Sequence, residues 1–202
     1  MTKNTLVTTR VDLLRHGEPM GGSKYRGQTD DPLSPNGWAQ MRAAVEKHRV
    51  AWTLVVSSPL SRCLEFAMEL NQKYNLPLRI EDRFMEMAFG FWEGKTKAQI
   101  GPEALAQFYD NPVEHSPSGG ENVADFYQRI IKAWDELINR FAGGQILIIT
   151  HAGVIRGLLA HIEGLKFREM VRLSIPFAGF ARIEVNHSTP FIEQNILLRP
   201  DK

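Results

Sequence analysis

The segment QILIITHAGVIRGLLAHI, residues 145–162, decides the fold class of this chain. Its first part is an apolar run that ends at Thr150. Such a run is typical of a strand buried on both faces, as in a parallel sheet with helices above and below. The residues after His151 have the spacing of a helix, and we expect one to follow directly. A buried strand that leads into a helix is typical of α/β proteins.

Strands and helices alternate over the rest of the chain. Further strands are predicted at 11–14, 53–56, 78–80, 178–185 and 191–197, the last two as a hairpin around 186–190. Helices are predicted at 35–49, from residue 59, at 103–109 and from residue 123. We therefore predict a three-layer α/β/α sandwich with a mostly parallel central sheet.

Cap signals mark three of the expected helix starts. Ser34-Pro35 and Ser58-Pro59 each combine an N-capping residue with a proline suited to the first helical position. Asn122 is the expected cap of the long helix. In the helix after Ser58-Pro59, helical spacing predicts that one face is buried, formed by Leu60, Cys63, Leu64, Ala67 and Met68.

Length, charge and cysteine content bound the class of protein. The 202 residues suit one domain, predicted to span 1–202, in which residues 81–120 form an insertion covering the site. A net charge of +1 gives no broad field to recruit nucleic acid or an anionic membrane. The single cysteine, Cys63, fits a reducing compartment. No segment approaches the ~20 apolar residues of a membrane span. We expect a cytoplasmic protein with no nucleic-acid or membrane partner. The sequence leaves open whether the chain forms a homodimer.

Two predicted strand ends carry histidines. The first strand ends at Arg15-His16-Gly17, and the strand of the opening segment ends at His151. In open α/β sheets ligands bind outside the carboxyl ends of the strands, so neighbouring strands would bring both histidines together. Arg62 lies in the first turn of a predicted helix, where the helix dipole favours an anion. A phosphate dianion is the natural complement, because the arginine fork matches its oxygens.

This set of residues suits phosphoryl transfer. A neutral His16 imidazole can attack phosphorus and form a covalent intermediate, and Gly17 would let the backbone approach closely. Arg15, Arg62 and His151 would stabilise charge on the transferred group. A carboxylic acid must also protonate the leaving oxygen. The candidates are Glu81, Asp82, Glu86 and Glu93. The apolar neighbours of Glu86 favour a raised pKa, but spacing alone leaves all four open.

The motifs LLRHGE, SSPLSRC, FMEMAFGFWEG, SGGEN and ITHAGVIRGLL occur in this order between Val11 and Leu159. In this order they resemble the histidine phosphatase superfamily, also called phosphoglycerate mutase-like. The resemblance implies that His16 is the phosphorylated nucleophile, that Arg15, Arg62 and His151 form the phosphate pocket, and that Glu86 is the proton donor. It implies no metal and no other cofactor.

Within the superfamily, RGQTDDPLSPNGWAQMRA, residues 26–43, looks most like the α-ribazole phosphatases of cobalamin biosynthesis. This likeness implies a small phosphate ester as substrate, either α-ribazole 5′-phosphate or adenosylcobalamin 5′-phosphate. The mutases resemble the chain less, because residues 95–118 contain no arginine and Phe89 stands where mutases usually have tyrosine. Broad action on sugar phosphates or phosphoglycerates is the alternative.

Residues near the motifs are predicted to contact the substrate. They are Gly17, Arg26, Gln28, Thr29 and Ala152. One departure from the family pattern is Gly22, which stands where many members have a phosphate-binding asparagine. We expect Gln28 or Thr29 to substitute for that contact.

Other function classes have weaker support. A phosphate-binding module without catalysis is disfavoured, because all five catalytic positions are filled. The chain has no HExxH or similar ligand spacing of a metal-dependent hydrolase and no GxxxxGK[ST] phosphate loop.

Overall fold

The computed structural model describes residues 7–188 and 191–200 of the chain. Six strands form one sheet in the order β3-β2-β4-β1-β5-β6. They are β1 (Val7–Arg15), β2 (Leu54–Ser57), β3 (Leu78–Ile80), β4 (Gln145–Thr150), β5 (Phe180–Ser188) and β6 (Phe191–Leu198). The first four run parallel to one another, and β5 is antiparallel to both β1 and β6. The predicted α/β sandwich with a mostly parallel sheet is confirmed.

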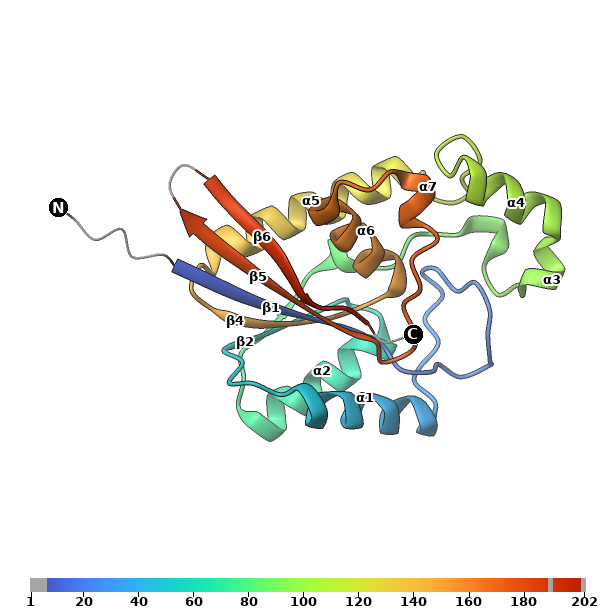
Figure 1. The fold of residues 1–202 in the computed structure, drawn as a ribbon. Helices are drawn as coiled ribbons and strands as arrows, with labels where there is room; N and C mark the ends of the chain where they lie inside the picture. The colour runs from blue at the N-terminus through green and yellow to red at the C-terminus, as the bar shows by residue number, and fades with distance from the viewer. Residues whose placement is uncertain (1–6, 189–190, 201–202) are drawn as a thin grey trace.

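Helices cover both faces of the sheet (Figure 1). Their bounds are α1 (Pro35–His48), α2 (Ser61–Tyr74), α3 (Lys97–Ile100), α4 (Pro102–Asp110), α5 (Val123–Arg140), α6 (Ala152–Glu163) and α7 (Phe167–Met170). Figure 1 shows α1 and α2 on one face and α5 and α6 on the other. No helix in the described part of the chain has the length and apolar character needed to span a membrane.

The central strand β4 separates two hydrophobic cores. Ile146 and Ile148 pack in the core of α5 and α6, whereas Leu147 and Ile149 pack in the core of α1 and α2. All four side chains are fully buried. This two-sided burial explains why the strand is continuously apolar, since neither of its faces meets water.

The start of α2 differs from the prediction. The helix begins at Ser61 and has no side-chain cap of its own, so Ser58-Pro59 does not begin it. Instead, Asp30 Oδ1 accepts hydrogen bonds from the backbone N (2.7 Å) and the hydroxyl (2.8 Å) of Ser61. A loop distant in sequence therefore supplies the cap.

Two details of the predicted elements were also wrong. The predicted buried face of α2 included Met68, which is 46% exposed, because that face turns through Cys63, Phe66, Ala67 and Leu70. The strand β5 begins at Phe180 and continues to Ser188, so residues 186–188 belong to the strand and not to a loop. The rest of the predicted hairpin loop, residues 189–190, lies outside the described residues.

Residues 81–120 form most of the connection between β3 and α5. They contain two short 3-10 helices, η1 (Asp82–Phe84) and η2 (Gly90–Trp92), followed by α3 and α4. In Figure 1, α3 and α4 lie beyond the carboxyl end of β1, near the loop that follows this strand. The segment is thus placed at the edge of the sheet where the predicted site lies.

The loop after β1 packs against α1 through two glycines. A Cβ at Gly17 would overlap the backbone of Gly37, and a Cβ at Gly37 would overlap the backbone of Glu18. The absence of a side chain at Gly17 therefore serves this contact between backbones. Gln40 Oε1 also accepts a hydrogen bond from the backbone N of Glu18, at 2.9 Å.

We expect Gly37→Ala to destabilise the protein by about 1–3 kcal/mol, because backbone atoms must shift to admit the new methyl group. The sign is diagnostic, since alanine alone favours a helix over glycine by about 1 kcal/mol. The reverse change at an exposed position of the same helix, Ala43→Gly, is the control and should cost about 1 kcal/mol through helix propensity. Urea denaturation measures both, and a stabilised Gly37→Ala chain would contradict the packing argument.

Candidate active site

The pairing of β1 with β4 brings the two predicted histidines together. Arg15 is opposite Thr150 in the parallel register, and the backbone N of His16 donates to Thr150 O at 2.9 Å. The rings of His16 and His151 consequently lie with their centroids 5.2 Å apart. Both follow the last residue of their strand, as the sequence predicts.

His16 is held in a form suited to nucleophilic attack. Its Nδ1 lies 2.7 Å from Gly17 O. A carbonyl oxygen only accepts, so Nδ1 carries the proton and Nε2 keeps its lone pair. Burial lowers the pKa of His16 well below its ordinary value, and the charges of Arg15 and Arg62 lower it further. The imidazole is therefore neutral at physiological pH.

His151 is fully buried at the N-terminus of α6. Its Nε2 lies 2.7 Å from Ser58 Oγ and 3.7 Å from Cys63 Sγ. Burial lowers the pKa of this imidazole too, and the charge of Arg62 lowers it further. Ser58 thus contacts His151 at the end of β2 instead of capping α2.

Two arginines lie beside the histidines and are held by backbone carbonyls. Arg15 donates to Ile175 O at 2.6 Å, and its guanidinium lies 4.1 Å from the ring centroid of Phe177. Arg62 donates to Gly27 O and Thr29 O, both at 2.7 Å. The Nε atoms of Arg15 and Arg62 are buried and have no acceptor among the described residues. Each therefore keeps an N–H donor that the protein does not use.

The charge of Arg15 persists at neutral pH. Burial lowers the pKa of Arg15 to about 10, against a smaller opposing effect of the Glu86 carboxylate. The side chain therefore stays protonated under physiological conditions.

Glu86 lies close to the first turn of α6, the helix that follows His151. Its Oε1 accepts from the backbone N of Met87 at 3.0 Å, and its Oε2 accepts from the backbone N of Gly153 at 3.1 Å. A Cβ at Gly153 would overlap the Glu86 carboxylate, so a larger residue there would displace the carboxylate from this position. These bonds hold the carboxylate near the start of α6, because its partner Gly153 is the second residue of that helix.

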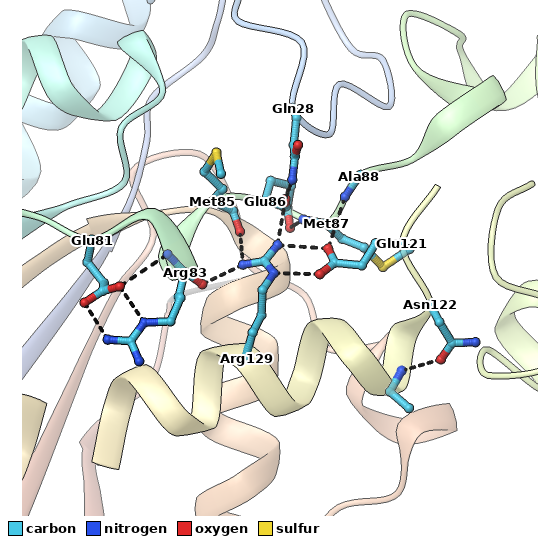
Figure 2. Close-up of polar contacts among 11 residues, drawn as sticks. Gln28, Glu81, Arg83, Met85, Glu86, Met87, Ala88, Glu121, Asn122 and Arg129 are labelled. Carbon is cyan, nitrogen blue, oxygen red and sulfur yellow. Dashed lines mark hydrogen bonds and ion pairs between the residues drawn. The ribbon is translucent and has the colours of Figure 1, made fainter. Parts of the chain in front are cut away.

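The backbone around Glu86 is held by Arg129 of α5 (Figure 2). Its guanidinium donates to the carbonyl oxygens of Arg83, Met85 and Glu86 and to both carboxylate oxygens of Glu121. Glu121 Oε2 also accepts from the backbone N of Ala88, at 3.4 Å. The Arg129–Glu121 pair thus attaches the Glu86 segment to a rigid helix.

The other three candidate acids have different surroundings. Glu81 pairs with Arg83 at 2.7 Å, and hydrogen bonding from this arginine lowers the pKa of Glu81. Glu93 accepts from the backbone N and the hydroxyl of Thr29 and from the backbone N of Phe89. Asp82 is exposed on η1. Only Glu86 of the four lines the cleft described next.

His16, Arg15, Arg62 and Glu86 line a cleft of about 210 Å³, whereas the fully buried His151 does not line it. The lining of the cleft contains six cationic side chains and one carboxylate, Glu86. The cations are Arg15, Lys24, Arg26, Arg62, Lys97 and Arg156, and the other lining residues are His16, Ser23, Tyr25, Gly27, Phe89, Tyr109, Ala152 and Phe177. So strong an excess of positive charge suits a phosphate-bearing ligand.

The predicted substrate contacts divide into two groups. Arg26 and Ala152 line the cleft, although Arg26 also binds Asp31 (2.9 Å) and the carbonyl oxygens of Met20 and Gly22. Gly17, Gln28 and Thr29 do not line it. Gln28 Nε2 instead donates to Glu86 O at 3.4 Å, and Thr29 is bound to Glu93.

Sequence reasoning did not single out several lining residues. Arg156 lies four residues after Ala152 on α6, and this helical spacing would have placed it on the face toward the cleft. Lys24, Tyr25, Lys97, Tyr109 and Phe177 come from irregular segments or short helices and carry no such signal. Within residues 7–188 and 191–200, no three His, Cys, Asp or Glu side chains are grouped as metal ligands.

The chain is similar to several known proteins, among them two phosphatases of known structure. The chain is 32% identical over 158 residues to a bifunctional protein of Mycobacterium tuberculosis, covering 75% of this chain but 43% of that protein. A mycobacterial glucosyl-3-phosphoglycerate phosphatase has a TM-score of 0.84 at 27% identity, covering 96% of this chain and 100% of its own. The α-ribazole phosphatase of Shigella flexneri has a TM-score of 0.76 at 26% identity, covering 93% and 95%.

The family model that matches the chain spans residues 11–195, which include both histidines, both arginines and Glu86. This range is nearly the whole of the described structure. The chain therefore belongs to the histidine phosphatase superfamily, branch 1.

Proposed function

We propose that this protein is a phosphomonoesterase that works through a phosphohistidine intermediate on His16. The observation that supports it is the neutral, buried His16, which lines a cleft with Arg15 and Arg62 and whose Nε2 is unprotonated. A nucleophile without charge beside two fixed cations suits attack on a dianionic phosphate.

In the first step, Nε2 of His16 attacks phosphorus and the bond to the leaving oxygen breaks. Glu86 gives its proton to that oxygen, so that a neutral alcohol departs. Arg15 and Arg62, with His151 beside them, stabilise the charge on the equatorial oxygens of the transferred group.

In the second step, the Glu86 carboxylate takes a proton from a water molecule. The water oxygen attacks phosphorus, the bond to His16 breaks, and phosphate leaves. Glu86 is then protonated again and His16 is neutral, so the enzyme has returned to its starting state.

The preferred substrate in this proposal is α-ribazole 5′-phosphate or adenosylcobalamin 5′-phosphate. Support comes from residues 26–43 and from the likeness to the Shigella flexneri enzyme. The alternative, broad action on sugar phosphates or phosphoglycerates, is supported by the likeness to glucosyl-3-phosphoglycerate phosphatase. A panel of phosphomonoesters that includes α-ribazole 5′-phosphate distinguishes the two. A mutase or an inactive phosphate-binding module is a weaker candidate.

Replacing the nucleophile tests the proposal directly. His16→Ala should abolish both turnover and the acid-labile phosphoenzyme, because no other described side chain offers a free imidazole Nε2 in the cleft. Rapid acid quench with ³²P-labelled substrate measures the phosphoenzyme. His115→Ala, at an exposed position away from the cleft, is the control. Full activity in the His16→Ala chain would refute the mechanism.

Replacing the proton donor tests the role of Glu86. We expect Glu86→Gln to lower kcat by ~10²–10⁴-fold for alkyl phosphates, and by less for p-nitrophenyl phosphate, whose leaving group needs no proton. Asp82→Asn is the control at an exposed carboxylate. If Glu86→Gln keeps a near-normal kcat and Glu93→Gln loses activity, then Glu93 is the proton donor instead.

Arg129 is a positioning residue in this scheme, and its test depends on the guanidinium fork. Arg129→Lys keeps the charge but replaces the fork by one ammonium, so the Glu86 segment loses several of its bonds. We expect kcat for alkyl phosphates to fall by ~10–10²-fold with little change in KM, because misplacing an acid slows the chemical step. Arg140→Lys, at the exposed end of α5, is the matched control. An equal loss for p-nitrophenyl phosphate, together with a lowered urea midpoint, would indicate a general structural defect instead.

A further inference from the structure

A carboxylate outside the cleft holds the loop that contacts Arg62. Glu93, directly after η2, is half-buried and does not line the cleft. Its Oε1 accepts hydrogen bonds from the backbone N of Gln28 and of Phe89, both at 3.1 Å. Its Oε2 accepts from the backbone N of Thr29 at 2.9 Å and from the hydroxyl of the same residue. Four donors therefore converge on one carboxylate, a group that only accepts when ionised.

The other side of the same loop contacts Arg62. Its Nη2 donates to Gly27 O and its Nη1 donates to Thr29 O, each at 2.7 Å. The peptide group between Gly27 and Gln28 makes both contacts, because its N–H donates to Glu93 and its carbonyl accepts from Arg62. A shift of the loop at Glu93 would therefore also move the acceptors of Arg62.

The loop packs directly against the carboxylate at Gly27. The φ of Gly27 is 55°, a left-handed backbone conformation that glycine adopts readily. A Cβ at this position would overlap Glu93 Oε1 and the backbone N of Phe89. The backbone of the loop and the Glu93 side chain are thus in contact, so the loop has little room to move relative to the carboxylate.

Arg62 keeps one donor for a ligand. Its side chain is almost fully buried, and its Nε has no acceptor among the described residues. The planar guanidinium matches phosphate oxygens only in a suitable orientation, so the carbonyls that orient it also determine how well it binds a phosphate.

We propose that Glu93 is a positioning residue for phosphate binding. It holds residues 27–29 so that their carbonyls orient Arg62 toward the phosphate group. Glu93 itself neither touches the phosphate nor transfers a proton. This inference rests on the proposed function for the contact between Arg62 and phosphate.

The sign of the effect separates positioning from a direct electrostatic role. Glu93 is a negative charge near a cationic cleft, so removing that charge alone should tighten the binding of an anion. Loss of positioning should weaken it instead. In Glu93→Gln the side-chain amide cannot accept from all four donors, because in either orientation its NH₂ group faces a backbone N–H.

Glu93→Gln should weaken the binding of inorganic phosphate by at least ~10-fold, because unpaired donors displace the loop. Isothermal titration calorimetry on the full chain measures this affinity. The matched control is Glu69→Gln on α2, the helix of Arg62, since Glu69 also accepts two hydrogen bonds, from Arg42, but lies away from the cleft. The control should keep its phosphate affinity. Unchanged or tighter phosphate binding in Glu93→Gln would overturn the proposal.

A milder variant carries the test if urea denaturation shows that Glu93→Gln is unfolded. Thr29→Val, at an exposed position, removes only the hydroxyl bond to Glu93. It should weaken phosphate binding by ~2–5-fold. An unchanged affinity in this variant would then overturn the proposal.

A double-mutant cycle shows whether Glu93 acts through Arg62. Arg62→Lys should weaken phosphate binding by ~10–10²-fold, because one ammonium replaces the fork. Adding Glu93→Gln to that chain should weaken binding by less than ~2-fold more, since the guanidinium that Glu93 positions is already absent. If the two losses multiply in full, Glu93 acts by another route and the proposal is overturned.

Kinetics separate positioning from proton donation. Glu93→Gln should lower kcat/KM by the same factor for alkyl phosphates and for p-nitrophenyl phosphate, because both share the phosphate contact. A loss confined to alkyl phosphates would make Glu93 an acid and overturn its positioning role. Failure of the proposed function would appear differently, as full activity in His16→Ala or as unchanged phosphate binding in Arg62→Lys.

Discussion

The parallel register between β1 and β4 is the constraint on which the rest of the site depends. A slip of one residue would turn every side chain of a strand to the opposite face. Both strands are buried on two faces, so such a slip would also exchange the residues of the two cores. The register that satisfies both cores is the one that places Arg15 opposite Thr150. The closeness of His16 and His151 therefore follows from hydrophobic packing several residues earlier in each strand.

The site also depends on which groups accept hydrogen bonds from its arginines. Arg15, Arg62 and Arg156 all donate to backbone carbonyls, at Ile175, at Gly27 and Thr29, and at Leu173. A carbonyl satisfies an N–H donor but leaves the positive charge uncompensated. Arg129 and Arg83, which do not line the cleft, are instead paired with carboxylates. Arg26 is the exception, because it lines the cleft and is paired with Asp31. Arg15, Arg62 and Arg156 therefore keep a charge that stays available to a ligand, whereas Arg83 and Arg129 hold structure.

The sequence predicted the parts of this arrangement that are encoded locally. The two-sided burial of β4, the cap at Ser34 and the cap at Asn122 each depend on a few consecutive residues, and the structure has all three. The meeting of His16, His151 and Arg62 at one edge needed, in addition, the rule that ligands bind at the carboxyl ends of strands. The choice of Glu86 among four carboxylates came only from the family resemblance.

The remaining features depend on contacts between distant segments. The cap of α2 comes from Asp30, the approach to Gly17 comes from Gly37, and Tyr25 meets Tyr109 of α4. Nothing in the spacing of these residues indicates their partners, because each pair is joined only by tertiary packing. The same holds for the loop that carries Phe177 over Arg15.

The only cysteine of the chain occupies an informative place in this arrangement. Cys63 is fully buried, its Sγ lies 3.7 Å from His151 Nε2, and burial raises the pKa of its thiol. A thiol that is shielded and protonated reacts slowly with alkylating reagents. Reaction at Cys63 therefore requires a local opening that exposes its side chain. The rate of that reaction reports the local opening of the active site in the unaltered chain, without an engineered label.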